Sequence, residues 1–129
     1  MNINNTHLLY SAPEIVSGSE LSDSDMLTMA ICRFPNKNHV NLKHWMIIDI
    51  VGTEQQLKNI KDAKKSPTIV YYHSVDCTHP ENSRQKNQSY SDYQISCKDN
   101  LFETEKTVYL LMGKGFRKTA SASLFSLLK

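Results

Sequence analysis

The chain has 129 residues, a hydrophobic fraction of 40% and a formal net charge of +2. These values are typical of one globular domain with a single core, and they exclude a disordered or fibrous chain. The longest apolar stretches, 45–51 and 108–112, are far shorter than the roughly 20 residues of a membrane span. The first residues also lack the basic and apolar parts of a signal peptide. We therefore expect one cytoplasmic domain over 1–129, in which 1–25 forms a partly ordered extension.

Charge and cysteine content bear on the partners and on the compartment. Residues 1–30 carry a net charge of −4, whereas 31–65 carry +4 and 66–129 carry +2. The isoelectric point of about 8.4 lies below the value of about 9 that is typical of dedicated nucleic-acid-binding domains. The three cysteines form a poor disulfide framework, which favours a reducing compartment. We expect each to be buried as a small apolar side chain: Cys32, Cys77 and Cys97.

The first predicted elements are a short helix and two strands. Ser11, followed by a proline and a glutamate, has the pattern of a helix N-terminus. We expect this helix near 12–17, followed by a loop through residue 25. Residues 27–34 alternate between two faces, as a strand does. The run 42–51 is rich in β-branched and aromatic residues and ends at a glycine, which predicts the second strand of an antiparallel hairpin.

A helix over 53–65 is predicted by Thr53 and Gln56, which have the spacing of a capping box. An apolar residue recurs every three positions along it, so we expect the helix to pack on a sheet. The strand-like run 68–77 follows directly. If both flanking strands lie in one sheet, they should be parallel and joined by a right-handed crossover.

The remaining segments are shorter. Residues 79–91 are almost all polar and are expected to form a long exposed loop. The elements expected after it are a strand over 93–97, a turn at 98–100, a hairpin with strands 101–104 and 107–112, a break at 113–115 and a final helix over 124–128. The predicted fold class is α+β, with a mixed, mainly antiparallel sheet of about five or six strands, one central helix and short terminal helices.

Two short motifs lie near the C-terminus: Leu101-Phe102-Glu103-Thr104 and, after an apolar strand, Gly113-Lys114-Gly115-Phe116-Arg117-Lys118. Together they are similar to the C-terminal signature of a small uncharacterised family found in bacterial and prophage genomes. A third stretch resembles the strand before that family's long loop: Tyr72-His73-Ser74-Val75. The resemblance covers 27–118. It implies a bacterial or phage domain and brings no known activity.

Four residues have side chains that bind zinc: His73, Cys77, His79 and Cys97. On one strand, His73 and Cys77 would share a face, and His79 would share it if the strand continued. Their spacing, H-x3-C-x-H, matches no standard zinc knuckle or finger, and Cys77 equally continues an apolar face. A zinc-stabilised domain is therefore the weakest hypothesis, and we expect no cofactor.

Two groups of basic residues are candidates for contact with an anion. Lys114, Arg117 and Lys118 surround two glycines whose backbone N–H groups could face an anion, although the spacing of a Walker loop is absent. The helix over 53–65 adds three lysines that solvation alone would also explain: Lys58, Lys61 and Lys65. A single patch of all six would indicate contact with nucleic acid that weakens with salt, but the sequence does not place them side by side.

A ribonuclease-type toxin is the catalytic form of this hypothesis. His73 would be the general base, and Arg117 or Lys118 would stabilise the phosphorane. No second histidine is well placed, since His39 and His44 flank the start of a strand, and the carboxylates of Glu103 and Glu105 are expected to be solvated on one turn. The sequence therefore favours a protein without enzymatic activity and leaves the question open.

The leading hypothesis is a small non-enzymatic protein-binding domain of bacterial or phage origin. Its surface would be the 79–91 loop with nearby aromatic and charged residues, because exposed tyrosines are frequent interface anchors: Tyr72, Tyr90, Tyr93, Arg84 and Lys86. One of Tyr71 and Tyr72 should face the core, since neighbouring strand residues point to opposite faces. An inhibitor of a host defence complex would be a natural role for a phage protein. The partner's identity and homodimerisation stay open.

Overall fold

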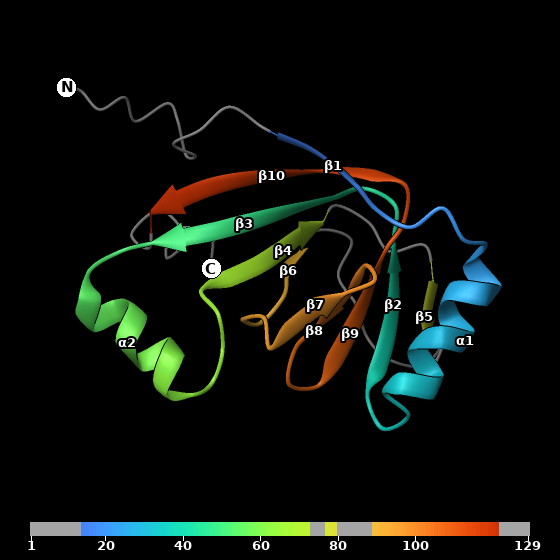
Figure 1. Ribbon diagram of the computed structural model, residues 1–129, viewed down its shortest axis with the longest axis horizontal. Helices are drawn as coiled ribbons and strands as arrows, with labels where there is room; N and C mark the ends of the chain where they lie inside the picture. Colours follow the sequence, from blue (N-terminus) through green and yellow to red (C-terminus); the bar gives the residue numbers. More distant parts are fainter. Residues whose placement is uncertain (1–13, 73–76, 80–88, 122–129) are drawn as a thin grey trace.

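The computed structural model describes residues 14–72, 77–79 and 89–121 of the chain. The described part contains two helices and ten strands (Figure 1), in the order β1 (Glu14–Ser17), α1 (Asp23–Arg33), β2 (Asn38–Leu42), β3 (Trp45–Val51), α2 (Glu54–Asp62), β4 (Thr68–Tyr72), β5 (Cys77–His79), β6 (Ser89–Tyr90), β7 (Ser96–Lys98), β8 (Leu101–Glu103), β9 (Thr107–Leu111) and β10 (Lys114–Ser121). The predicted α+β class is confirmed.

The strands form two sheets, so the predicted single sheet of five or six strands is wrong. Sheet I has the strand order β1-β10-β3-β4-β6, and sheet II has the order β5-β2-β9-β8-β7. Most neighbours are antiparallel, but β3 and β10 are parallel in sheet I, and β2 and β9 are parallel in sheet II. Both sheets are therefore mixed.

Two long stretches of chain connect the sheets. Residues 38–51 contribute β2 to sheet II and β3 to sheet I, and 107–121 contribute β9 and β10 in the same way (Figure 1). The stretches run parallel, with Asn38 opposite Thr107 in one sheet and Met46 opposite Phe116 in the other. Paired residues are 69 positions apart in sheet II and 70 positions apart in sheet I. The second stretch therefore has one extra residue between the sheets, where Gly113 has a φ of 66°. A left-handed glycine thus accommodates the extra residue at the bend.

The core lies in layers. Side chains of both sheets meet in the cluster Val40, Leu42, Trp45, Ile47, Val70, Tyr72, Phe102, Tyr109 and Leu111. Alternate residues of sheet II point the other way and pack against α1, which buries Met26 and Ala30. On the opposite face of sheet I, a third cluster contains Ile48, Ile50, Ile69 and Ala120. The order of layers is therefore α1, sheet II and sheet I.

Trp45 lies where the two long stretches bend. Its indole Nε1 donates a hydrogen bond to the carbonyl oxygen of Met112 at 2.9 Å. Two glycines give the ring its space, because a β-carbon at Gly18 or at Gly115 would overlap it. Backbone hydrogen bonds from Gly18 to Gly113 (2.6 Å) and from Ser19 to Leu111 (2.8 Å) hold β1 against the same bend.

The predictions for the N-terminal third are wrong. The predicted strand over 27–34 is helical instead, because α1 covers 27–33 and Phe34 is its C-cap. Ser22 caps the start of α1 by accepting from the backbone N–H of Asp25 at 3.1 Å. Met26 and Ala30, one turn apart, supply the buried stripe. The predicted helix over 12–17 is replaced by β1, which pairs with β10 from Glu14 to Ser17. Tertiary pairing prevails over the weak local capping signal.

The helix predicted over 53–65 is confirmed in type and start. It is α2, with the capping box between Thr53 and Gln56, and it ends before Lys64, whose φ is 61°. The expected packing is wrong, since none of its residues is buried. The right-handed crossover is also wrong, because β3 and β4 are antiparallel neighbours. Figure 1 shows α2 extending beyond the end of sheet I.

The C-terminal hairpins are predicted well. The turn at 98–100 joins β7 to β8, and both Asp99 and Asn100 have positive φ, as two-residue hairpin turns require. The hairpin of β8 and β9 is also confirmed. The predicted break at 113–115 is wrong beyond Gly113, because β10 begins at Lys114. The loop residues 80–88 and the predicted final helix lie outside the described residues.

Candidate functional site

The residues predicted to bind a partner are not all on the surface. Tyr72 is only 2% exposed and packs in the core between the sheets, so its predicted exposure is wrong. Tyr71, its neighbour, is half-buried and points to the opposite face, as strand alternation requires. Tyr90 and Tyr93 are half-buried and pack against the cluster on that opposite face. Arg84 and Lys86 lie outside the described residues.

The outward face of sheet I carries a line of apolar and aromatic side chains. The strand registers place five residues opposite one another across all five strands, and we call them the Phe116 row: Ile15, Phe116, Met46, Tyr71 and Tyr90. Ile15 is 68% exposed and Phe116 is 44% exposed. The other three are half-buried. One end of this sheet face is therefore open, whereas the end with Ile48 and Ile50 is buried.

A pocket of about 240 Å³ opens at the centre of the Phe116 row. It is lined by His44, Trp45, Met46, Tyr71, Lys114 and Phe116. By strand alternation, Lys114 and Lys118 lie on the same face as Phe116. The described strands of sheet I place no Asp or Glu on this face, because Asp49 and Glu14 alternate to the other side. The row is thus an apolar surface with a positively charged border.

The six candidate basic residues do not form one patch. Lys114 lies level with the start of β3, whereas α2, with Lys58 and Lys61, follows its end. The part of β3 between its first and last outward residues, Met46 and Ile50, is roughly 13 Å long and separates them. Lys65 is bound by the carboxylate of Glu105 at 3.0 Å. Only Lys114 and Lys118 lie on the face of the Phe116 row.

Arg117 points away from the two neighbouring lysines and has a structural partner. Its Nε and Nη2 donate to the two carboxylate oxygens of Asp49 at 2.7 and 2.8 Å. Thr68 donates to the same carboxylate at 3.1 Å, so the contact joins β10, β3 and β4. Hydrogen bonding to Asp49 raises the pKa of Arg117. A role for Arg117 in stabilising a phosphorane is therefore less favourable than the sequence suggested.

The three candidate zinc ligands whose backbone the structure describes are not all brought together. His79 and Cys77 belong to β5, at one edge of sheet II, and Cys97 belongs to β7, at the other edge. Four strand spacings of about 4.8 Å put these edges roughly 19 Å apart, so Cys97 cannot complete the set. His73 lies outside the described residues. Within the described segments, no three His, Cys, Asp or Glu residues form a group that could hold a metal ion.

Two of the three cysteines differ from the prediction, and the side chain of Cys77 lies outside the described part of the structure. Cys32 and Cys97 are exposed, so their expected burial is wrong. Cys32 lies on the outward face of helix α1, which was predicted as a strand, and Cys97 lies on β7, an edge strand of sheet II. Desolvation raises the pKa of the Cys97 thiol, although the charge of Arg117 opposes this.

Among the described residues, His39 and His44 do not form a catalytic pair. His39 is buried, and its Nε2 donates to the carbonyl oxygen of Phe34 at 2.8 Å, which fixes the ring beside α1. His44 is exposed and lines the pocket at the Phe116 row. The two therefore lie in different parts of the molecule, on either side of sheet II.

The prediction that the carboxylate of Glu103 is solvated is wrong, because its side chain is only 16% exposed. Lys37 donates from Nζ to one of its carboxylate oxygens, and Ser96 donates to the other at 2.7 Å. Desolvation by itself would raise the pKa of Glu103, but the hydrogen bonds from Lys37 and Ser96 and the charge of Lys37 lower it by more. The carboxylate therefore ties β8 to β7 and to the turn before β2. Glu105, by contrast, is exposed as predicted.

We expect Glu103→Gln to lower the free energy of unfolding by about 2 kcal/mol at neutral pH, because Lys37 keeps its charge without an ionised partner. The lowered pKa means that the carboxylate stabilises the fold above its unfolded pKa, near 4.5, and that this contribution is lost as the pH falls through the folded pKa. Urea unfolding of both proteins at several pH values tests this. The difference between them should shrink below pH 4.5 or so.

Glu105→Gln is the matched control, because Glu105 is exposed and pairs with Lys65 on the same side of the molecule. Its effect should be clearly smaller, as for exposed ion pairs in general. A Glu103→Gln effect that stays the same from neutral to acid pH would contradict the assigned ion pair.

A family model described as "Domain of unknown function (DUF6957)" matches residues 17–126, which spans both sheets and α1. The chain belongs to the DUF6957 family. This confirms the expected relation to an uncharacterised family. Neither curated proteins nor solved structures gave a significant match. In the described part of this DUF6957 domain, no helix is long and apolar enough to cross a membrane.

The Phe116 row of this DUF6957 domain was missed by sequence reasoning. Its members come from five strands, the segment holding Ile15 was predicted as a helix, and a break in the chain was predicted at 113–115, directly before Phe116. The signal in β10 was weak, because Phe116 and Ala120 are apolar whereas Lys118, on the same face between them, is charged. Gly113 and Gly115 led to the prediction of a break instead of a strand. The sequence alone therefore identified Tyr90, Lys114 and Lys118 of this surface, but not its apolar centre.

Proposed function

We propose that this domain is a non-enzymatic binding protein of bacterial or phage origin that docks a partner protein on the Phe116 row. The observation that carries the proposal is the exposure of Ile15 and Phe116, at one end of a register that crosses the whole of sheet I. Large apolar side chains that line up on a sheet face and surround a pocket are typical of interaction sites.

The surface also indicates the chemistry of the partner. The pocket beside Phe116 suits one apolar anchor side chain, and Lys114 and Lys118 at its border suit carboxylates next to that anchor. We therefore propose a partner with an apolar residue flanked by Asp or Glu. An inhibitor of a host defence complex is the specific form of this proposal, and the family resemblance is its only support.

Phe116→Ala tests the proposal, because it removes the exposed ring and leaves the backbone of β10 intact. The partner would be identified by cross-linking in the native host and then purified for a titration. We expect an affinity loss of about 30-fold or more, as for the central residue of an interface. Leu21→Ala is the matched control, since Leu21 is 49% exposed and lies outside the row. Equal affinities of the two variants would reject the row as the binding site.

A second candidate function is binding of single-stranded nucleic acid on the same face. The observation that favours it is the row of aromatic rings from Phe116 to Tyr71 and Tyr90, with two lysines and, in the described strands of sheet I, no carboxylate on that face. Bases stack on such rings while lysines contact the phosphates. Two phosphate contacts predict a log–log salt slope of about −1.4 for a labelled single strand. Fluorescence anisotropy that shows no binding of labelled oligo-dT or oligo-U at low salt would reject this function.

A further inference from the structure

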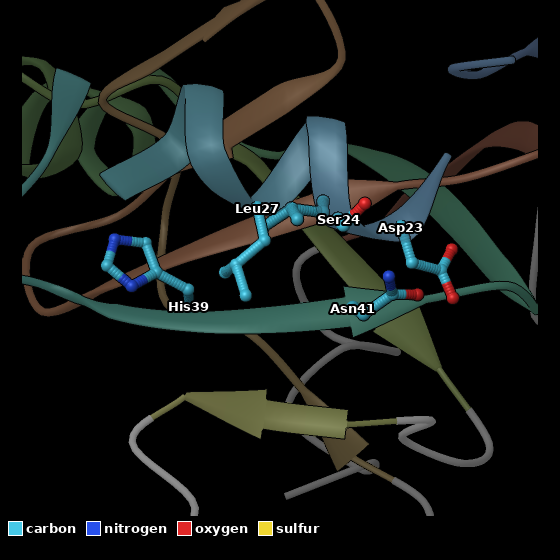
Figure 2. A pocket seen from close by; sticks show the side chains of 6 residues that line it. Asp23, Ser24, Leu27, His39 and Asn41 are labelled. Carbon is cyan, nitrogen blue, oxygen red and sulfur yellow. The ribbon is translucent and has the colours of Figure 1, made fainter. Parts of the chain in front are cut away.

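A second pocket lies between α1 and β2, on the side of sheet II that faces away from sheet I. Its volume is about 250 Å³, and it is lined by Asp23, Ser24, Leu27, His39, Asn41 and Leu110. Figure 2 shows the side chains of Leu27, His39 and Asn41 in the space between the helix and the strand. Both sheets separate this pocket from the Phe116 row, so it is a different site.

The alternation of β2 creates this pocket. Val40 and Leu42 point into the core between the sheets, which leaves His39 and Asn41 on the face toward α1. The helix buries Met26 and Ala30 against apolar residues of β8 and β9 rather than against β2. The space over β2, beside the first turns of α1, is therefore left without a large apolar side chain from the helix.

Asn41 is the unusual residue of this pocket. It is 2% exposed, and its Oδ1 has no hydrogen-bond partner within the described part of the protein. Leaving a buried amide oxygen without a donor costs about 1–3 kcal/mol, and native proteins rarely do so. A leucine at this position would be favourable if packing were its only role. The buried amide therefore indicates that a bound group donates a hydrogen bond to it.

The other lining groups define what kind of group this is. Leu27 and Leu110 form apolar walls. The Asp23 carboxylate stands at the opening, where it shares a 3.2 Å ion pair with Lys43. His39 is held by the carbonyl oxygen of Phe34. The unpartnered Oδ1 of Asn41 and the carboxylate of Asp23 are acceptors, while the walls favour a short alkyl group.

We infer that this pocket binds a small molecule with an N–H donor on a short branched alkyl body, which is a primary amide or amine. The N–H group donates to Oδ1 of Asn41, and the alkyl group packs between Leu27 and Leu110. The volume is below the roughly 300–1,000 Å³ of sites for drug-sized ligands, so the ligand has few heavy atoms. This site goes beyond the proposed protein partner and does not depend on it.

Three probes with the same alkyl body test this inference: isobutyramide, isobutylamine and isobutyrate. The full chain, labelled with ¹⁵N, would be titrated with each while amide chemical shifts are recorded. We expect saturable shifts around α1 and β2 with the amide or the amine, and none with isobutyrate, which carries only acceptors. Saturable binding of isobutyrate with equal affinity, or the absence of saturable shifts with both N–H probes, would overturn the inference.

Two variants separate a ligand site from a purely structural amide. Asn41→Leu removes the acceptor and should weaken binding by about tenfold or more. Leu27→Trp fills the space without changing Asn41 and should weaken it as well, so a folding defect in one variant does not decide the result. Leu21→Ala, outside the pocket, should bind as the native chain does. Unchanged affinity in a folded Asn41→Leu or Leu27→Trp protein would contradict the site.

Discussion

Trp45→Ala is expected to lower the free energy of unfolding by about 4 kcal/mol, the range seen when a large buried aromatic side chain is removed. Trp45 is 4% exposed and packs with core residues of both sheets. Its ring also covers the bend at Gly115, and its Nε1 satisfies the carbonyl of Met112. The substitution would leave a cavity and a buried acceptor at the point where the sheets join. Urea unfolding, followed by fluorescence or circular dichroism, measures the loss.

Trp45→Phe separates the two contributions. It keeps most of the apolar contact but removes the donor to Met112, so we expect a loss of about 2 kcal/mol. If Trp45→Ala cost no more than Trp45→Phe, the packing of the ring on the bend would not be what stabilises the joint between the sheets.

Gly115→Val is expected to lower the free energy of unfolding by about 3 kcal/mol, because overpacking forces a rigid ring or the backbone to move. A β-carbon at this position overlaps the ring of Trp45, and that ring is confined by Gly18, directly after β1. The ring of Trp45 and the backbone at Gly18 cannot move away without separating β1 from β10. Urea unfolding of the native chain and the variant measures this loss, and the slope of the free energy of unfolding against urea concentration should be the same for both.

Gly113→Ala is the matched control for this prediction. Gly113 has a positive φ of 66°, but a β-carbon there would meet no atom within 4 Å. Its replacement should cost only the conformational penalty of about 1 kcal/mol. In addition, Trp45→Leu should reduce the cost of Gly115→Val, because the ring that causes the clash is gone. Equal costs at both glycines would show that the ring contact is not responsible.

The parts of the fold that could be predicted from sequence are those specified within a few residues. The capping box of Thr53 and Gln56 requires no tertiary contact, and neither does the turn at Asp99 and Asn100. Helix α1 was missed because its apolar residues, spaced by two as well as by four, fit both periodicities. Only its burial against sheet II decides between them.

The candidate site was harder to predict because it depends on pairing between distant strands. Phe116 meets Met46 through a parallel register, and Ile15 meets Phe116 through an edge strand that looked like a helix start. No local pattern links these residues. Arg117, predicted to contact an anion, instead binds Asp49, since the same register brings them together. Sequence patterns identified which types of residue could form a site, but the pairing of distant strands determined which of them lie side by side.

The parallel pairing of 38–51 with 107–121 also has a consequence for how the protein forms. Asn38 pairs with Thr107, 69 positions later, and each sheet needs a strand from both stretches. In a nascent chain, the apolar side chains of β2 and β3 therefore stay without their partner strands until β9 and β10 have left the ribosome. Such long-range contacts slow folding to milliseconds or longer, on the order of seconds for the most non-local topologies. During this wait the chain would depend on chaperones to avoid aggregation.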